Sequence, residues 1–95
     1  MKKELLERLE IEVKACKRYA ENSIKKSKEG KIGLAINFLE IAGIAKKCAD
    51  QVHEELWEVS KGNLTNEEFQ LFAESETLDR ELKKAYKELN IARQR

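Results

Sequence analysis

Residues 32–50 read IGLAINFLEIAGIAKKCAD, and this stretch decides the fold because its apolar side chains cover most of a helical circumference. Its main polar interruptions before Asp50 are Asn37, Glu40, Lys46 and Lys47. A helix that is apolar on nearly all sides has to be covered on more than one side. We therefore predict that it is either the central helix of a bundle or part of a seam between identical chains.

The helix that contains this stretch is predicted to cover residues 32–61. Its apolar residues recur in alternating steps of three and four, which is the spacing of one helix face. The row predicted to face the neighbouring helix consists of Ala35, Phe38, Ala42, Ala45, Ala49, Val52, Leu56 and Val59. The additional apolar residues, among them Ile36, Ile41 and Ile44, lie off this row.

On the N-terminal side, a second periodic stretch predicts a helix over residues 3–28. Gly30 follows lysines in the preceding turn, a pattern typical of a helix C-terminus. The row of this helix tapers from large to small side chains toward the turn, which lets the next helix approach closely. The row consists of Leu6, Leu9, Val13, Cys16, Ala20, Ser23 and Ser27.

On the C-terminal side, Gly62 marks the end of the middle helix, and Thr65 with Glu68 three residues later forms a capping-box pattern. A third helix is therefore predicted over residues 66–93. Its row consists of Leu71, Ser75, Leu78, Leu82, Ala85, Leu89 and Ala92. Short connections force antiparallel neighbours, so the prediction is one all-α domain over residues 1–95: a three-helix up-down-up bundle with long helices, for which dimerisation is an option.

The overall composition narrows the function classes. Charged residues make up 39% of the chain and hydrophobic residues 41%, a balance that excludes disorder and suits helices with one apolar face. The formal net charge is +1, so net charge alone makes no case for nucleic acid or an acidic membrane as a partner. No run of about 18 apolar residues occurs. We expect a cytoplasmic protein that does not span a membrane.

Residues 30–42, GKIGLAINFLEIA, resemble the second-helix signature of tetratricopeptide repeats and of the three-helix MIT domain. In both, a glycine precedes an aliphatic or aromatic residue, and Ala-Ile and a later alanine follow at helical spacing. The MIT resemblance implies a groove between helices that receives a short helical peptide. No second copy of the signature follows at a period near 34 residues, which counts against a repeat array.

Side chains capable of chemistry are few. Asp50 and His53, three residues apart, share a helix face, but a metal centre needs more ligands than these two. Cys16 and Cys48 both lie inside helical patterns and are predicted to be small, largely buried side chains rather than a disulfide. No phosphate-binding loop or nucleophile motif is present. We therefore expect no enzyme activity and assign no catalytic, cofactor-binding or metal-binding residue.

The first functional hypothesis is a small protein-interaction module that acts as a subunit, adaptor or regulator and forms a homo-oligomer, most simply a dimer. Its predicted partner interface consists of Ile36, Ile41, Ile44 and Trp57. The alternative is a small subunit that contacts nucleic-acid phosphates through a basic pole at the first turn. The predicted phosphate contacts are Lys25, Lys26, Lys28 and Lys31, with Lys84, Lys87, Arg93 and Arg95 brought toward the same pole by the antiparallel fold.

Overall fold

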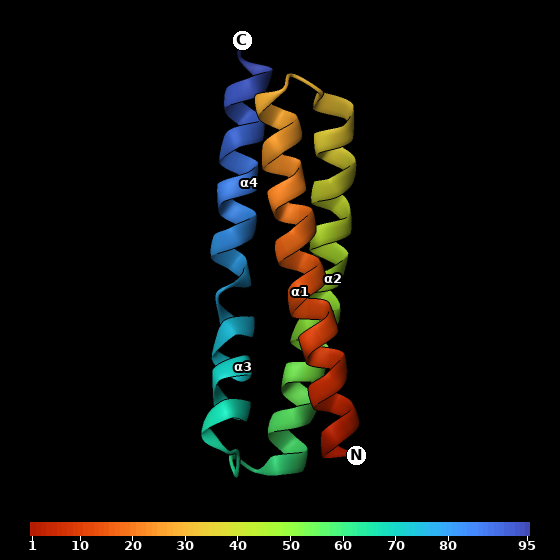
Figure 1. The fold of residues 1–95 in the computed structure, drawn as a ribbon, viewed down its shortest axis with the longest axis vertical. Coiled ribbons are helices and arrows are strands. Elements are labelled where there is room, and N and C mark those ends of the chain that lie inside the picture. The colour runs from red at the N-terminus through yellow and green to blue at the C-terminus, as the bar shows by residue number, and fades with distance from the viewer.

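The computed structural model describes residues 1–95 and contains helices and no strands. The helices are α1 (Lys2–Lys28), α2 (Ile32–Ser60), α3 (Asn66–Glu76) and α4 (Leu78–Arg93). Segments α3 and α4 together form the third helix of an up-down-up bundle that measures 49 × 17 × 16 Å, with the two chain ends at opposite poles (Figure 1). The predicted all-α, three-helix bundle is confirmed.

Both predicted glycine turns form. Gly30 adopts φ +78°, and the Lys31 amide donates to the Lys26 carbonyl at 2.9 Å, which closes the C-terminus of α1. At the other turn, Lys61 and Gly62 have φ values of 53° and 79°. Two successive left-handed residues reverse the chain sharply, so α2 ends at Ser60, one residue before its predicted end.

The capping box predicted for the third helix is present. The Glu68 amide donates to Thr65 Oγ1 at 3.2 Å, and the Thr65 amide donates to the Glu68 carboxylate at 2.9 Å. These two bonds satisfy backbone donors that have no partner inside the helix. The helix accordingly begins at Asn66, as predicted.

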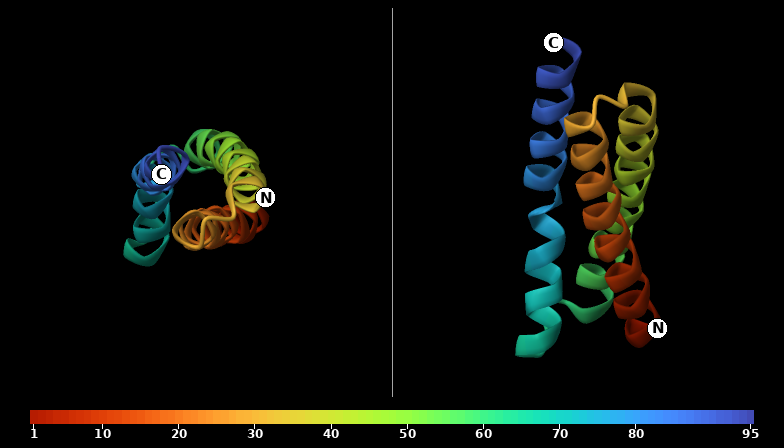
Figure 2. Two further views of the ribbon diagram at one scale, coloured as in Figure 1. Left: turned by 90° about the horizontal axis from the view of Figure 1, so that it is seen from above. Right: turned by 45° about the horizontal axis from the view of Figure 1, so that its top comes forward.

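The third helix is not continuous, and the predicted single helix over residues 66–93 is wrong at Thr77. The hydroxyl of Ser75 donates to the Phe72 carbonyl at 2.6 Å, and that of Thr77 donates to the Glu74 carbonyl at 2.7 Å. The Thr77 amide also bonds three residues back, to the Glu74 carbonyl at 3.0 Å. This tight turn interrupts the regular α-helical pattern, and α3 departs from the line of α4 (Figure 2).

The buried rows are shifted from the predicted ones at three positions. Each of three predicted residues lies at a half-buried edge position while its sequence neighbour fills the core. The buried residues are Leu5, Leu39 and Phe72, in place of Leu6, Phe38 and Leu71. Val59, predicted for the row of α2, is exposed near the end of that helix.

Small side chains dominate the part of α2 that enters the core. Ala35, Ala42, Ala45 and Ala49 are all buried on this helix. Because alanine projects little beyond the backbone, α1 and α2 can pack closely, and the buried Ser23 hydroxyl of α1 donates to the Ala35 carbonyl of α2 at 2.7 Å. Several larger aliphatic side chains of α2, among them Ile41 and Ile44, lie on other sides of the helix, whereas Leu39 fills the core between the alanines.

Candidate interaction surfaces

The side of the α1–α2 hairpin away from α3 and α4 carries several exposed aliphatic side chains. We call this surface the outer face and define it by Ile11, Ala15, Leu34, Ile41, Ile44 and Cys48. On α2, Leu34, Ile41 and Ile44 are exposed to 46%, 42% and 63%. On α1, Ile11 is exposed to 63%. The outer face therefore presents apolar surface from both helices of the hairpin.

The position of the outer face follows from contacts along the α1–α2 boundary. Arg8 of α1 and Glu55 of α2 line one solvent-open hollow at this boundary. Cys48 and Ile41 precede Glu55 by one and two heptads, so they project from nearly the same side of α2 as Glu55. Aromatic stacking of Tyr19 on Phe38, with centroids 6.0 Å apart, joins the two helices farther along.

Two of the four predicted interface residues, Ile41 and Ile44, lie together on the outer face, and the other two lie elsewhere. Ile36 is half-buried and packs against the core, so it presents little free surface. Trp57 is on the side of α2 that meets α3, where its ring lies 5.6 Å from that of Phe72. Its indole also lies 3.2 Å from the position that a Cβ on Gly62 would occupy. Trp57 thus covers the turn at this end of the bundle.

His53 is half-buried against α3. Its ring stacks on Phe72 with centroids 3.6 Å apart, and its Nε2 atom lies 3.5 Å from a carboxylate oxygen of Glu76. Asp50 pairs instead with Lys46 at 2.6 Å, and Lys46 also reaches Asp79 of α4 at 3.3 Å. Asp50 and His53 therefore have different partners. The His53 contact joins α2 to α3, whereas the Asp50 contact lies within α2.

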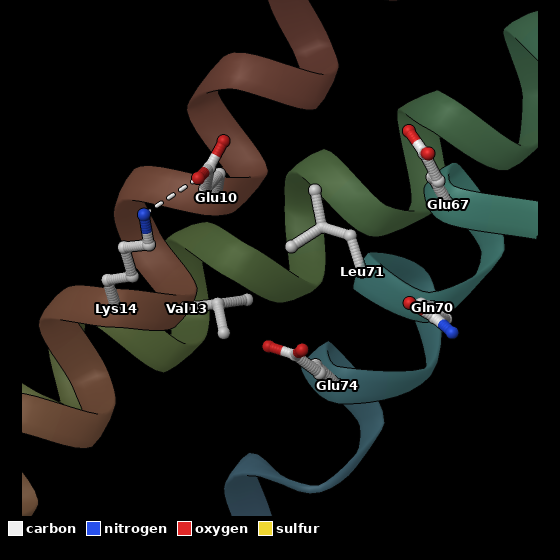
Figure 3. A pocket seen from close by; sticks show the side chains of 7 residues that line it. All are labelled: Glu10, Val13, Lys14, Glu67, Gln70, Leu71 and Glu74. Atoms are coloured by element: carbon white, nitrogen blue, oxygen red, sulfur yellow. Dashed lines mark hydrogen bonds and ion pairs between the residues drawn. The ribbon is translucent and has the colours of Figure 1, made fainter.

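A hollow of about 290 Å³ opens between α1 and α3 (Figure 3). The side chains of Val13 and Leu71 form its apolar part, and the remaining lining is polar. Of its carboxylates, Glu10 pairs with Lys14 at 2.7 Å and Glu74 pairs with Lys17 at 3.4 Å. The lining contains no cysteine, histidine or hydroxyl side chain.

The basic pole lies where the α1–α2 turn and the C-terminal end of α4 come together (Figure 1). Lys26 and Lys31 both lie 3.5 Å from carboxylate oxygens of Glu29, whereas Lys25 and Lys28 have no ion-pair partner. Although desolvation opposes ionisation, the two ammonium groups lower the pKa of Glu29 below its usual value. The ionised Glu29 thus neutralises part of the charge that the sequence places at this pole.

The two cysteines are free thiols in different environments. Cys16 is fully buried, and this burial raises its pKa to about 11. Because the thiolate is the reactive form, Cys16 is inert near neutral pH. Cys48 is half-buried at the edge of the outer face.

No group of three or more histidine, cysteine or carboxylate side chains converges in the geometry of a metal site. None of the helices combines the length and the apolar character that crossing a membrane requires. Comparisons of the chain with known protein families, with curated proteins and with solved structures found no match. The resemblance of residues 30–42 to tetratricopeptide and MIT hairpins stays a prediction; within the hairpin, Gly30 makes the turn and buried Ala35 and Ala42 allow close packing.

Proposed function

We propose that this protein is a small non-catalytic interaction module that self-associates through the outer face. The observation that carries the proposal is the inverted distribution of side chains on α2. Alanines fill most of its buried row between residues 35 and 49, while Leu34, Ile41 and Ile44 are exposed. Isoleucine and leucine gain far more than alanine from leaving water, because they carry more apolar surface. A cluster of exposed aliphatic side chains marks a surface that binds another macromolecule.

The proposal is tested by sedimentation velocity and light scattering on purified protein. We expect concentration-dependent dimerisation of the wild-type protein, and loss of the dimer in the Ile41→Glu and Ile44→Glu variants. Ile91→Glu is the matched control, because Ile91 is an exposed isoleucine on α4, away from the outer face. Circular dichroism verifies that each variant keeps its helices. Wild-type protein that stays monomeric up to several hundred micromolar contradicts the proposal.

Several companion assignments belong to this proposal. We assign no catalytic, cofactor-binding or metal-binding residue, and we place the protein in the cytoplasm. The cytoplasmic placement is supported by the two free thiols, which fit a reducing compartment. The charged surface of the helices fits an aqueous setting.

A second candidate function is contact with nucleic-acid phosphates through the basic pole. It is favoured by Lys25 and Lys28, which have no ion-pair partner and lie at the same end as the C-terminus of α4. If it is correct, low-salt binding to mixed DNA or RNA weakens steeply with added salt and is lost on Lys25→Glu and Lys28→Glu substitution. Lys83→Glu is the control, because Lys83 is an exposed lysine near the N-terminal end of α4, away from the basic pole. If the protein does not bind mixed DNA or RNA at low salt, this candidate function is excluded.

A further inference from the structure

Four charged side chains border the middle of the outer face, and none of them has an ion-pair partner within the chain. They are Glu12 and Arg18 on α1 and Glu40 and Lys47 on α2. The guanidinium of Arg18 lies over the Tyr19 ring, 5.1 Å from its centroid, and donates to the Tyr19 hydroxyl at 3.3 Å. Because Tyr19 itself stacks on Phe38 of α2, these contacts hold the positive charge at the α1–α2 boundary.

The antiparallel register of the hairpin fixes the relative heights of these charges. The Ser23–Ala35 hydrogen bond and the Tyr19–Phe38 stack set which residues of α1 and α2 lie side by side. Counting from these contacts places Arg18 level with Glu40. At 1.5 Å per residue, Glu12 falls within about 3 Å of the level of Lys47. Positive and negative charges therefore alternate both along each helix and between the helices.

This alternation is self-complementary. Glu12 and Arg18 lie three residues before and after Ala15, and Glu40 and Lys47 are centred close to the same level on α2. Consider a half-turn about an axis that lies in the plane of the outer face and runs across both helices at this level. It brings Glu12 to the level of Arg18, and Glu40 to the level of Lys47. A second copy placed face to face about that axis consequently sets every one of the four charges opposite its counter-charge.

Resting on the proposed self-association, we infer that the partner is a second copy of this chain, bound antiparallel so that α2 packs on α2. Ile41 then lies against Ile44 of the second copy, and Glu40 faces Lys47 of the second copy. On the neighbouring helices, Arg18 faces Glu12 of the second copy. The twofold axis repeats each of these contacts, so the dimer contains two of each.

The spacing along α2 favours pairing with another α2 over pairing with α1. Leu34, Asn37, Ile41, Ile44 and Cys48 follow steps of three and four, which is the pattern of a helix–helix seam. In the antiparallel register Asn37 lies opposite Cys48 of the second copy, at the two ends of the apolar contact. The corresponding outward row of α1 carries several charged or polar residues, so it offers α2 a poorer apolar surface.

Charge reversal tests the electrostatic part of the inference. Glu40→Lys and Lys47→Glu each create two repulsive contacts in a homodimer, and we expect each to raise the dissociation constant by about tenfold or more. An equimolar mixture of the two variants restores two attractive contacts and forms a heterodimer of near wild-type affinity. Lys83→Glu, on α4, is the control and leaves dimerisation unchanged. A wild-type dimer that is insensitive to both single reversals overturns the charge pairing.

A disulfide test reports on the orientation. In the Asn37→Cys variant, the introduced thiol lies next to Cys48 of the second copy, within the short Cα separation that a disulfide requires. Mild oxidation gives a covalent dimer, and peptide mapping finds the introduced cysteine joined to Cys48. In the wild-type antiparallel dimer the two Cys48 residues are offset by about 16 Å along the helix direction, so they do not join.

The outcomes separate the two proposals. Monomeric wild-type protein contradicts both the self-association and its geometry. A dimer disrupted by Ile41→Glu that fails to give the mapped disulfide leaves the self-association intact and overturns the antiparallel register. A wild-type disulfide between two Cys48 residues indicates parallel pairing and likewise overturns it.

Discussion

The buried Ser23 and Ser27 hydroxyls lead to opposite predictions for the same substitution. Both serines lie on the side of α1 that faces the core, one turn apart, and both side chains are fully buried. The Ser23 hydroxyl donates to the Ala35 carbonyl at 2.7 Å, whereas the Ser27 hydroxyl has no hydrogen-bond partner. Replacing each serine by alanine removes one oxygen and changes the helix backbone very little.

The magnitude follows from the difference in hydrogen bonding. Losing the Ser23 bond costs about 1 kcal/mol, and the higher helix propensity of alanine offsets about 0.5 kcal/mol of that. Removing the unpartnered Ser27 hydroxyl relieves a desolvation penalty of about 1–3 kcal/mol and adds the same propensity gain. Ser23→Ala therefore lowers the free energy of unfolding by about 0.5 kcal/mol, and Ser27→Ala raises it by about 1.5 kcal/mol or more.

Urea denaturation followed by circular dichroism measures both changes, with Ser23→Ala serving as the matched control for Ser27→Ala. The free energies of unfolding of the two variants should differ by about 2 kcal/mol, and because one kilocalorie per mole shifts the melting temperature of a domain this small by about 4–8 °C, thermal melts resolve the difference too. Equal destabilisation by the two substitutions refutes the reasoning, because it means that hydrogen bonding does not distinguish the two sites.

Three further predictions concern the thiols, the third helix and the second turn. At pH 8 a thiol reagent modifies Cys48 in the folded protein, while Cys16, whose pKa burial raises to about 11, reacts only in denaturant. The backbone hydrogen bond from Thr65 lowers the pKa of Glu68 below 4.5. The ionised Glu68 therefore stabilises the fold above pH 4.5, and this stabilisation is lost as the pH falls through the lowered pKa. In melts at different pH values, Glu68→Gln reduces the loss of stability at acidic pH. Gly62→Ala lowers the free energy of unfolding by about 1 kcal/mol or more in urea denaturation, because φ is +79° and the added Cβ lies 3.2 Å from the Trp57 ring.

The helix ends were predictable because each depends on local chemistry. Gly30 and Gly62 adopt the positive φ values that glycine tolerates best, and both terminate helices where the sequence indicated. Thr65 and Glu68 form the capping box that their three-residue spacing predicts. In each case the signal lies within a few residues of the structural feature.

The break at Thr77 was not predictable in the same way. Serine and threonine occur within many continuous helices, so Ser75 and Thr77 do not by themselves indicate an interruption. The break becomes visible only in the structure, where their hydroxyls bond to carbonyls three residues back. The one-residue shift of the core at Leu5 and Leu39 has a related origin, since adjacent apolar residues satisfy the same spacing and packing against the neighbouring helix selects one of them.

Prediction of the candidate site was limited because an apolar side chain on a helix can be either buried or exposed. The sequence indicated excess apolar surface on residues 32–48 but not which side the bundle would leave open. Ile36 packs against the core, while Ile41 and Ile44 remain exposed. Trp57, predicted as an interface residue, is 49% exposed, although Phe72 of α3 lies against one side of its ring. Such placements depend on contacts between distant segments.

The large and small side chains of α2 and α4 are distributed differently between the core and the surface. Along α4 the large side chains Leu78 and Leu89 are buried, as an amphipathic helix normally arranges them. Along α2 between residues 35 and 49 the order is reversed, with alanine inside and isoleucine outside. Both helices pack against α1, and the reversal is more pronounced on α2 than on α4, where Ala85 is buried and Ile91 is exposed beside the buried leucines. The close α1–α2 packing that alanine permits also makes this hairpin a firm platform, so little ordering cost opposes association through its outer face.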